Sequence, residues 1–258
     1  MRSALLPAAF ACLLLGTALT GCQSGKLPDP NDSSVVAESP EIMMRNLVNW
    51  RTRLDRRVAR RELSPDERDR IMRERVTEYV ELITPEMATP QNAWLYGDLF
   101  RDAGRWQEAY RLYDLARKAA GTEDRKVNDS LRFARAAARL GRHTEALAAV
   151  ASTFSANPEE KAPILPAVLY EVIPAAEEGG KEPAVKYAQA LEEAVKQHFA
   201  TVVDTATEPG RNFLAARPIH VQKAWTKIVS LYQKAGDPAG ARAALARADR
   251  VSRSSASL

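Results

Sequence analysis

Cysteine is almost absent from this chain of 258 residues, which contains only Cys12 and Cys22. No cysteine follows residue 22, so the body of the protein can form neither an internal disulfide nor a cysteine-ligated zinc site. This scarcity excludes a small fold held together by disulfides. It also raises the question of what Cys22 does.

Histidine is scarce as well, and His143, His198 and His220 are widely spaced. The sequence has no His-x-x-x-His or His-Glu pair and no glycine-rich phosphate loop, so it offers no recognisable metal, nucleotide or triad chemistry. His143 occupies a turn position, which indicates a packing or surface role. The acidic pairs at 177–178 and 192–193 are expected to be solvated. We therefore expect no catalytic residue, no metal, no cofactor and no enzymatic activity.

Alternating runs of Val, Ile and Thr, the pattern of a half-buried strand, are also missing. Alanine, leucine, arginine and glutamate dominate the segment 40–251, which predicts an all-α body. Ser64-Pro65-Asp66-Glu67 marks one helix start, with an N-cap serine, a proline in the first turn and a capping-box glutamate. Thr89-Pro90 and Arg217-Pro218 carry part of this pattern and predict two further helix starts.

The segment 1–21 is organised like an export signal, with a positive residue, Arg2, before an apolar stretch at 4–19. A bilayer-spanning helix needs roughly 18 to 20 apolar residues, more than this stretch supplies, so a cleaved signal peptide is expected at 1–21. Leu19-Thr20-Gly21-Cys22 resembles the cleavage and lipid-attachment box of bacterial lipoproteins, although Thr20 replaces the usual Ala or Ser. The alternative is an ordinary signal peptide followed by an incidental cysteine.

The lipoprotein resemblance implies that Cys22 carries covalent lipid, which makes the bilayer a partner of this chain. Gln23 stands where Asp would favour the inner membrane, so the resemblance implies the outer membrane, facing the periplasm. Residues 22–39 are rich in Pro, Asp, Ser and Asn after the cysteine and predict a flexible tether. We therefore expect a lipid-anchored protein of the bacterial cell envelope, with its folded body close to a membrane.

Positive charge is concentrated in one short segment. Residues 45–61 contain seven arginines and one acidic residue, a net charge of +6. After removal of Arg2 the chain has 36 basic and 33 acidic side chains, or +3, so the rest sums to −3. The basic character of the chain therefore comes from a single predicted helix.

On a helical wheel Arg53, Arg56 and Arg60 lie opposite the apolar face of this helix. They are candidate membrane-facing residues that contact lipid phosphates. The alternative is an ordinary solvated face that pairs with acids of the next helix, namely Asp66, Glu67 or Glu74. Nucleic acid is an unsuitable partner because an export signal places these arginines outside the cytoplasm.

A glycine followed five positions later by an alanine occurs in four related segments, at 104–109, 141–146, 179–184 and 236–241. The first two intervals between these alanines slightly exceed the roughly 34 residues of a helical repeat, and the third is much longer. The spacing is therefore typical of a helical repeat with insertions. In each unit the glycine is expected to end the first helix, and the alanine allows the second helix to pack closely against it.

The first unit resembles the tetratricopeptide repeat most clearly. Tyr96-Gly97 and Phe100 stand where that family has Leu-Gly and Tyr, and Ala109 and Tyr113 match its Ala-x-x-x-Phe. The resemblance covers about 91–248 and implies an α-solenoid of helix-turn-helix (TPR-like) repeats. The predicted domains after the tether are a helical pair at 40–88, the repeat domain at 89–251 and a disordered tail at 252–258.

The third unit departs most from the family pattern. Glu171-Val172 replaces Leu-Gly, and Pro174 is expected to interrupt the first helix. The second helix of this unit keeps a helical period and is predicted to run to about Asp204, before a break at 208–210. The segment 192–216 is thus an insertion relative to the repeat.

In solenoids of this family the first helix of each pair lines a groove that binds a peptide or a helix. The inward positions of the first two units are Trp94, Asp98, Arg101, Asp102, Asn128, Leu131, Arg135 and Arg139. Those of the fourth unit are Lys223, Thr226, Ser230 and Lys234. For each of these side chains, a simply solvated surface is the alternative.

Two functions follow from these patterns. The leading one is a membrane-anchored extracytoplasmic scaffold that takes part in envelope complex assembly by binding a protein or peptide partner. The alternative is a structural or ligand-binding cell-envelope lipoprotein without a dedicated protein partner.

Overall fold

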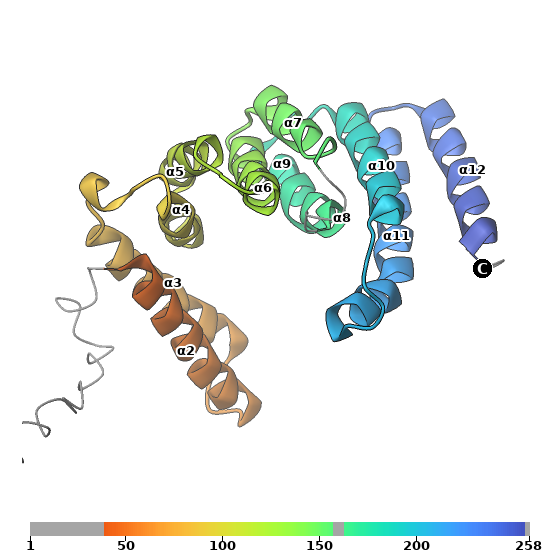
Figure 1. The fold of residues 1–258 in the computed structure, drawn as a ribbon. Coiled ribbons are helices and arrows are strands. Elements are labelled where there is room, and N and C mark those ends of the chain that lie inside the picture. Colours follow the sequence, from red (N-terminus) through yellow and green to blue (C-terminus); the bar gives the residue numbers. More distant parts are fainter. Residues whose placement is uncertain (1–38, 157–162, 256–258) are drawn as a thin grey trace, which may run out of the picture.

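The computed structural model describes residues 39–156 and 163–255, and every regular element in these ranges is helical (Figure 1). The predicted all-α class is confirmed. The predictions for 1–21, Cys22 and 22–38 lie outside the described residues. In chain order the elements are α2 (Pro40–Ala59), α3 (Pro65–Glu81), η1 (Pro85–Met87), α4 (Ala93–Asp102), α5 (Trp106–Lys118), α6 (Glu123–Arg139), α7 (His143–Ser152), α8 (Ile164–Ala167), η2 (Val168–Val172), α9 (Ile173–Gly179), α10 (Ala184–Ala200), α11 (Glu208–Lys234) and α12 (Pro238–Ser255).

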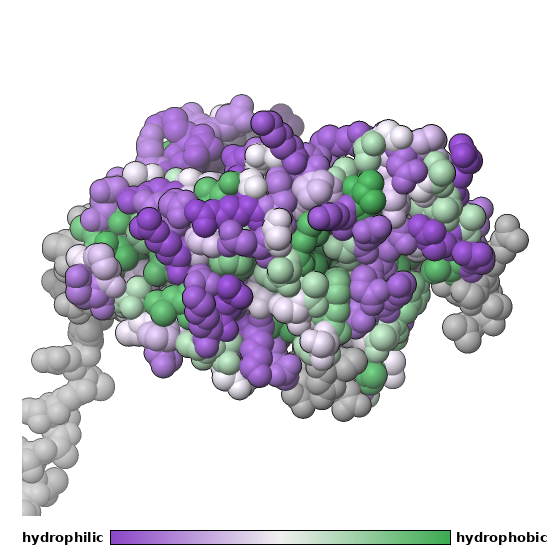
Figure 2. Space-filling view, turned by 90° about the horizontal axis from the view of Figure 1, so that it is seen from above, coloured by the Kyte–Doolittle hydropathy of each residue, from purple (hydrophilic) through white to green (hydrophobic). Residues whose placement is uncertain are grey.

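The helices stack in chain order along an arch (Figure 1). The main contacts join helices that are close in sequence, such as α4 with α5, α5 with α6 and α11 with α12. One hydrophobic core runs through the stack, from Met43 in α2 to Ala244 in α12. The face seen in Figure 2 mixes hydrophilic residues with groups of hydrophobic ones. None of the described helices combines the length and the apolar content that a bilayer crossing requires.

The four predicted turns share one backbone conformation. Gly104, Gly141, Gly180 and Gly236 have φ values of 76°, 71°, 72° and 70°, a left-handed conformation that glycine adopts without steric cost. In the first turn the Gly104 amide donates to the Arg101 carbonyl at 2.8 Å, and the Arg105 amide donates to the Phe100 carbonyl, five positions earlier. The turns at 141 and 236 repeat these bonds, which are typical of a glycine-terminated helix. The predicted turns at 104, 141 and 236 are therefore confirmed, whereas in the third segment the left-handed glycine is Gly180, one position after the aligned Gly179, which is the last residue of α9.

The alanines of the four segments pack as expected. Ala109 and Ala146 have no exposed surface, and Ala184 and Ala241 are 7% and 5% exposed. A methyl side chain at these positions lets the second helix of each pair approach the first closely. Small residues therefore set the spacing of the stack.

The third pair differs from the prediction because its first helix is continuous. A π-helical segment, η2, directly precedes α9, in which Pro174 is the second residue. A proline lacks the N–H for a helical bond, and its ring collides with the carbonyl four positions earlier. That carbonyl belongs to Tyr170 within η2, where the wider π turn gives the ring room. Pro174 is thus accommodated, and the predicted interruption is wrong.

The boundaries in the last third also need correction. α10 ends at Ala200 and not near Asp204, and α11 begins at Glu208, where Thr207 Oγ1 accepts a hydrogen bond from the Gly210 amide. The predicted helix start at Arg217-Pro218 is wrong, because α11 continues through the exposed Pro218. α12 extends to Ser255, so the predicted disordered tail is wrong for 252–255.

The long α11 packs its first turns against the end of α10 around His198. This side chain is 1% exposed, with its ring 4.7 Å from that of Phe213 and 6.1 Å from that of His220. Burial, and then the charge of Arg217, lowers the pKa of His198 to about 4. The imidazole is therefore neutral at pH 7 and packs as a core residue.

Close backbone approach gives the first testable prediction. A Cβ atom at Gly179 would lie 2.2 Å from the carbonyl oxygen of Ala138 in α6, so Gly179→Ala must push α9 away from α6. We expect the free energy of unfolding to fall by about 1–3 kcal/mol, measured by urea denaturation. Gly121→Ala is the matched control, because nothing lies within 4 Å of a Cβ atom there. Equal stability of the two variants would contradict the close approach.

Candidate binding face along the first helices

The first helix of each pair contributes to one side of the stack. In Figure 1, α4 and α6 lie below α5 and α7, on the inner side of the arch. The η2–α9 segment contacts α6, and α11 is joined to α9 by an ion pair between Lys227 and Glu177 at 2.8 Å. We call the surface made by α4, α6, η2–α9 and α11 the first-helix face.

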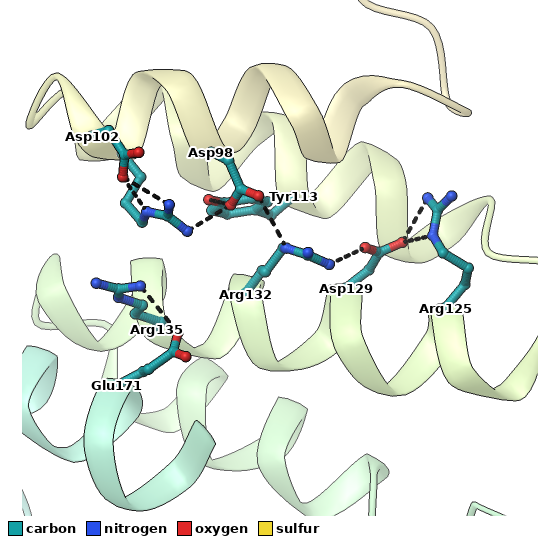
Figure 3. Close-up of polar contacts among 9 residues, drawn as sticks. Asp98, Asp102, Tyr113, Arg125, Asp129, Arg132, Arg135 and Glu171 are labelled. Atoms are coloured by element: carbon teal, nitrogen blue, oxygen red, sulfur yellow. Dashed lines mark hydrogen bonds and ion pairs between the residues drawn. The ribbon is translucent and has the colours of Figure 1, made fainter. Parts of the chain in front are cut away.

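A buried carboxylate organises the α4 part of this face. Asp98 is 6% exposed, and its Oδ1 atom accepts hydrogen bonds from the Tyr113 hydroxyl at 2.7 Å and from Arg101 at 2.6 Å (Figure 3). Burial and the charge of Asp98 raise the pKa of Tyr113 well above its usual value, so the phenol keeps its proton and donates. Arg101 also pairs with Asp102 at 2.7 Å.

A second buried carboxylate lies on α6. Asp129 has no exposed surface and accepts hydrogen bonds from Arg125 at 2.9 Å and from Arg132 at 3.2 Å. Arg132 also reaches Asp98 at 3.5 Å, so this one guanidinium joins α6 to α4 (Figure 3). The ring of Trp94 lies against both arginines, with guanidinium carbons 5.4 Å and 4.6 Å from its centroid. The cluster combines a buried charge network with a stacked aromatic ring.

The ion pairs continue toward the C-terminal helices. Arg135 pairs with Glu171 of η2 at 3.0 Å, as Figure 3 shows, and Arg139 pairs with Glu178 of α9 at 3.2 Å. Both guanidiniums also lie near the ring of Trp106, at 5.6 Å and 5.8 Å from its centroid. A series of charge pairs therefore crosses from α4 through α6 and α9 to α11.

The structure places most of the candidate groove residues on this face. Trp94, Arg101, Asn128, Arg135 and Arg139 are partly exposed, and Asp102 is exposed. The four positions of the fourth unit, Lys223, Thr226, Ser230 and Lys234, are exposed on α11.

Two candidates are not available to a partner. Leu131 is 6% exposed and belongs to the hydrophobic core, so the prediction that it lines a groove is wrong. Asp98 faces the correct side but is buried and bonded to its own neighbours. Both residues stabilise the stack from within.

Sequence reasoning missed the residues that connect the helices. These are Tyr113 as a hydrogen-bond donor, Asp129, Arg132, Glu171 and Glu178. Within α6 a signal exists, because Arg125, Asp129 and Arg132 are spaced i, i+4 and i+7 and share one side of a helix. The partners on other helices carry no such signal.

Of the acidic residues expected to be solvated, Glu178 is exposed and Glu177, Glu192 and Glu193 are partly exposed, and all four accept contacts from other side chains. Glu177 accepts from Lys227 at 2.8 Å and Glu178 pairs with Arg139. Glu192 accepts hydrogen bonds from Tyr232 at 3.2 Å and from Arg247 at 2.7 Å. Glu177, Glu178 and Glu192 therefore join neighbouring helices, whereas Glu193 pairs with Lys196 of its own helix.

His143 has a packing role. Its Nε2 atom lies 2.8 Å from the Gly180 carbonyl oxygen and its Nδ1 atom lies 3.1 Å from the Tyr187 hydroxyl. The neutral form with the proton on Nε2 satisfies both contacts, because Nε2–H donates to the carbonyl and Nδ1 accepts from the phenol. Across the described residues, no group of three or more His, Cys, Asp or Glu side chains has the geometry to hold a metal ion.

The candidate membrane-facing residues Arg53, Arg56 and Arg60 are all exposed on α2 or at its C-cap. The alternative pairing does not form as expected, because Glu67 and Glu74 both pair with Arg70 of their own helix, at 3.4 Å and 2.7 Å. The basic side of α2 therefore remains open to solvent.

Comparison with protein families, with curated proteins and with solved structures finds no match to this chain.

The Asp129 cluster gives the second prediction. Asp129→Asn removes the negative charge that compensates two arginines at a fully buried position, and we expect it to lower the free energy of unfolding by about 3 kcal/mol. Asp124→Asn is the matched control, about one helical turn earlier on α6, where the carboxylate is exposed and accepts a hydrogen bond only from Asn128 among the described residues. Urea denaturation of both variants measures the difference. Equal small losses would show that the buried network contributes little.

Proposed function

We propose that this chain is a membrane-anchored extracytoplasmic scaffold with TPR-like repeats, whose first-helix face binds a protein or peptide partner in the cell envelope. One observation carries the proposal. Four helix pairs, each with a left-handed glycine between its two helices, stack in order, so their first helices form one extended surface. Extended surfaces of this kind suit the binding of a peptide or a helix along their length.

The side chains of the face support recognition rather than chemistry. Its carboxylates and guanidiniums are engaged in ion pairs between helices, which fixes their positions before any partner arrives. Trp94 is partly exposed, and the guanidiniums of Arg125 and Arg132 both lie against its ring. Tryptophan and arginine are frequent in the centres of protein interfaces. We propose Trp94 as the anchor point for the partner and assign no catalytic activity to the chain.

The proposed anchor is lipid on Cys22, with the segment up to Ser39 acting as a tether. It is supported by the resemblance of Leu19-Thr20-Gly21-Cys22 to a lipoprotein box and by the apolar stretch before it. With Gln23 after the cysteine, we propose the outer membrane, with the folded body in the periplasm. Two or three acyl chains would make such an attachment stable.

A second candidate function is a structural envelope lipoprotein without a dedicated protein partner. The ion pairs favour it, because Arg135 and Arg139, both proposed for the groove, are occupied by Glu171 and Glu178. In that case the face exists to hold the stack together. The first experiment below separates the two functions.

Site-specific photo-crosslinking tests the first-helix face without disturbing the core. A photo-reactive residue at Asp102 or Ser230, both exposed on this face, should give a defined adduct with one partner in intact cells. The same residue at the exposed Arg111 of α5 or Ala148 of α7 is the matched control and should give none. Adducts from α5 and α7 alone would move the site to the second helices. Absence of adducts from all four positions would favour the structural alternative.

The anchor is tested by Cys22→Ser, which removes the proposed acylation site. We expect the protein to move from the membrane fraction to the soluble fraction and to lose labelling by radioactive palmitate. Cys12→Ser is the matched control, because it changes the other cysteine and leaves the proposed box intact. Retention of the Cys22→Ser protein in membranes with its label would contradict lipidation at this residue.

A further inference from the structure

We propose that one side of α2 is a second membrane-contact surface, which binds anionic lipid headgroups and orients the folded body against the bilayer. The inference rests on the proposed function in one respect, namely that the chain lies beside a membrane. The residues concerned are Arg45, Arg53, Arg56, Arg57 and Arg60, which we call the arginine stripe.

Helical geometry aligns the stripe. At about 3.6 residues per turn, positions 45, 53, 56, 57 and 60 fall within about 120° of arc around the axis of α2. All five side chains are exposed. The buried residues Met43, Leu47 and Leu54 lie outside this arc and pack into the core, so the stripe does not support the fold. Glu41 and Asp55, the two acidic residues of α2, also fall outside the arc.

The stripe has few internal partners. Among the described residues, no ion pair joins Arg45, Arg53 or Arg56 to a carboxylate. Arg57 and Arg60 both approach Glu62, at 3.7 Å, which exceeds hydrogen-bond distance.

Apart from Glu62, three carboxylates of α2 and α3 pair with arginines outside the stripe. Asp55 pairs with Arg68 of α3 at 3.0 Å, and Glu67 and Glu74 pair with Arg70. This distribution differs from the first-helix face, where the charges compensate one another. A stripe of five arginines with one nearby carboxylate, Glu62, retains a net positive charge and is suited to an external anion.

The position of α2 identifies that anion. Helix α2 begins directly after Ser39, so only the segment 23–39 separates it from Cys22. Such a segment spans at most about 60 Å even when fully extended, so an acylated Cys22 keeps the stripe within reach of headgroups. Guanidinium groups bind phosphate through paired N–H donors. A tethered cationic helix beside a bilayer therefore meets lipid phosphates at high local concentration.

The test is binding of the full chain to vesicles of phosphatidylcholine with and without phosphatidylglycerol, at low and high salt. The apolar N-terminal stretch contributes equally with both vesicle types, so the difference between them isolates the electrostatic contact. We expect Arg45→Gln/Arg53→Gln/Arg56→Gln to weaken binding to phosphatidylglycerol vesicles by about fivefold per arginine, or roughly a hundredfold. High salt should weaken wild-type binding similarly.

The matched control is Arg111→Gln/Arg242→Gln/Arg250→Gln. It changes three exposed arginines on α5 and α12 and lowers the formal net charge equally, from +4 to +1 (4 − 3). Retained affinity in this control supports the stripe, and unchanged helical circular dichroism verifies that both variants are folded. Equal losses in the two variants would reduce the effect to net charge and overturn the proposal.

Two further outcomes would also overturn it. The first is equal wild-type binding to vesicles with and without phosphatidylglycerol. The second is tight binding of soluble polyphosphate without vesicle binding, which would assign the stripe to a soluble polyanion. The result is separable from the proposed function, because neither palmitate labelling of Cys22 nor crosslinking from Asp102 involves the stripe.

Discussion

Close approach between helix backbones is the constraint on which the rest of the structure depends. A pair of helices cannot bury its apolar faces alone, so each pair must pack against the next. The approach is closest where side chains are smallest. Gly97 faces the ring of Tyr113, Gly179 faces the carbonyl of Ala138, and alanines occupy much of the buried side of α6. Larger side chains at these points would separate the helices and open the core.

The charge pairs follow from this spacing. When helices lie close, long side chains at the edges of their contacts can interact with the neighbouring helix. Arg132 of α6 thereby forms ion pairs with both Asp98 of α4 and Asp129 of its own helix. Buried carboxylates are costly unless they are paired and hydrogen-bonded, and both are. The first-helix face is therefore a preorganised surface, while the five arginines of the stripe on α2 have only Glu62 as an ion-pair partner among the described residues. The two surfaces therefore differ in how far ion pairs within the protein neutralise their charges.

Local rules account for what could be predicted from the sequence. The turns at Gly104, Gly141 and Gly236 follow from a glycine that ends a helix, and the helical class follows from periodicity and the lack of strand patterns. The cross-helix partners could not be predicted, because the bond between Arg135 and Glu171 depends on how two pairs are rotated against each other. The predicted groove position of Leu131 is wrong for the same reason. The rotation of α6 about its own axis decides whether this side chain faces the surface or the core.

The prolines show where a local rule fails. An Arg-Pro step favours a helix start, yet α11 passes through Pro218, which is exposed, so the lost hydrogen bond lies on the solvent side. Pro174 is tolerated because η2 widens the turn before it. In both cases the surrounding tertiary packing outweighs the preference of a single residue.

The stacking order has a mechanical consequence. Since the principal contacts connect only helices close in sequence, the curvature of the arch is the sum of small rotations at successive junctions. A rotation of a few degrees at each junction changes the span between the two ends while every local contact persists. The width of the arch can thus vary through these junctions while the individual helices stay folded.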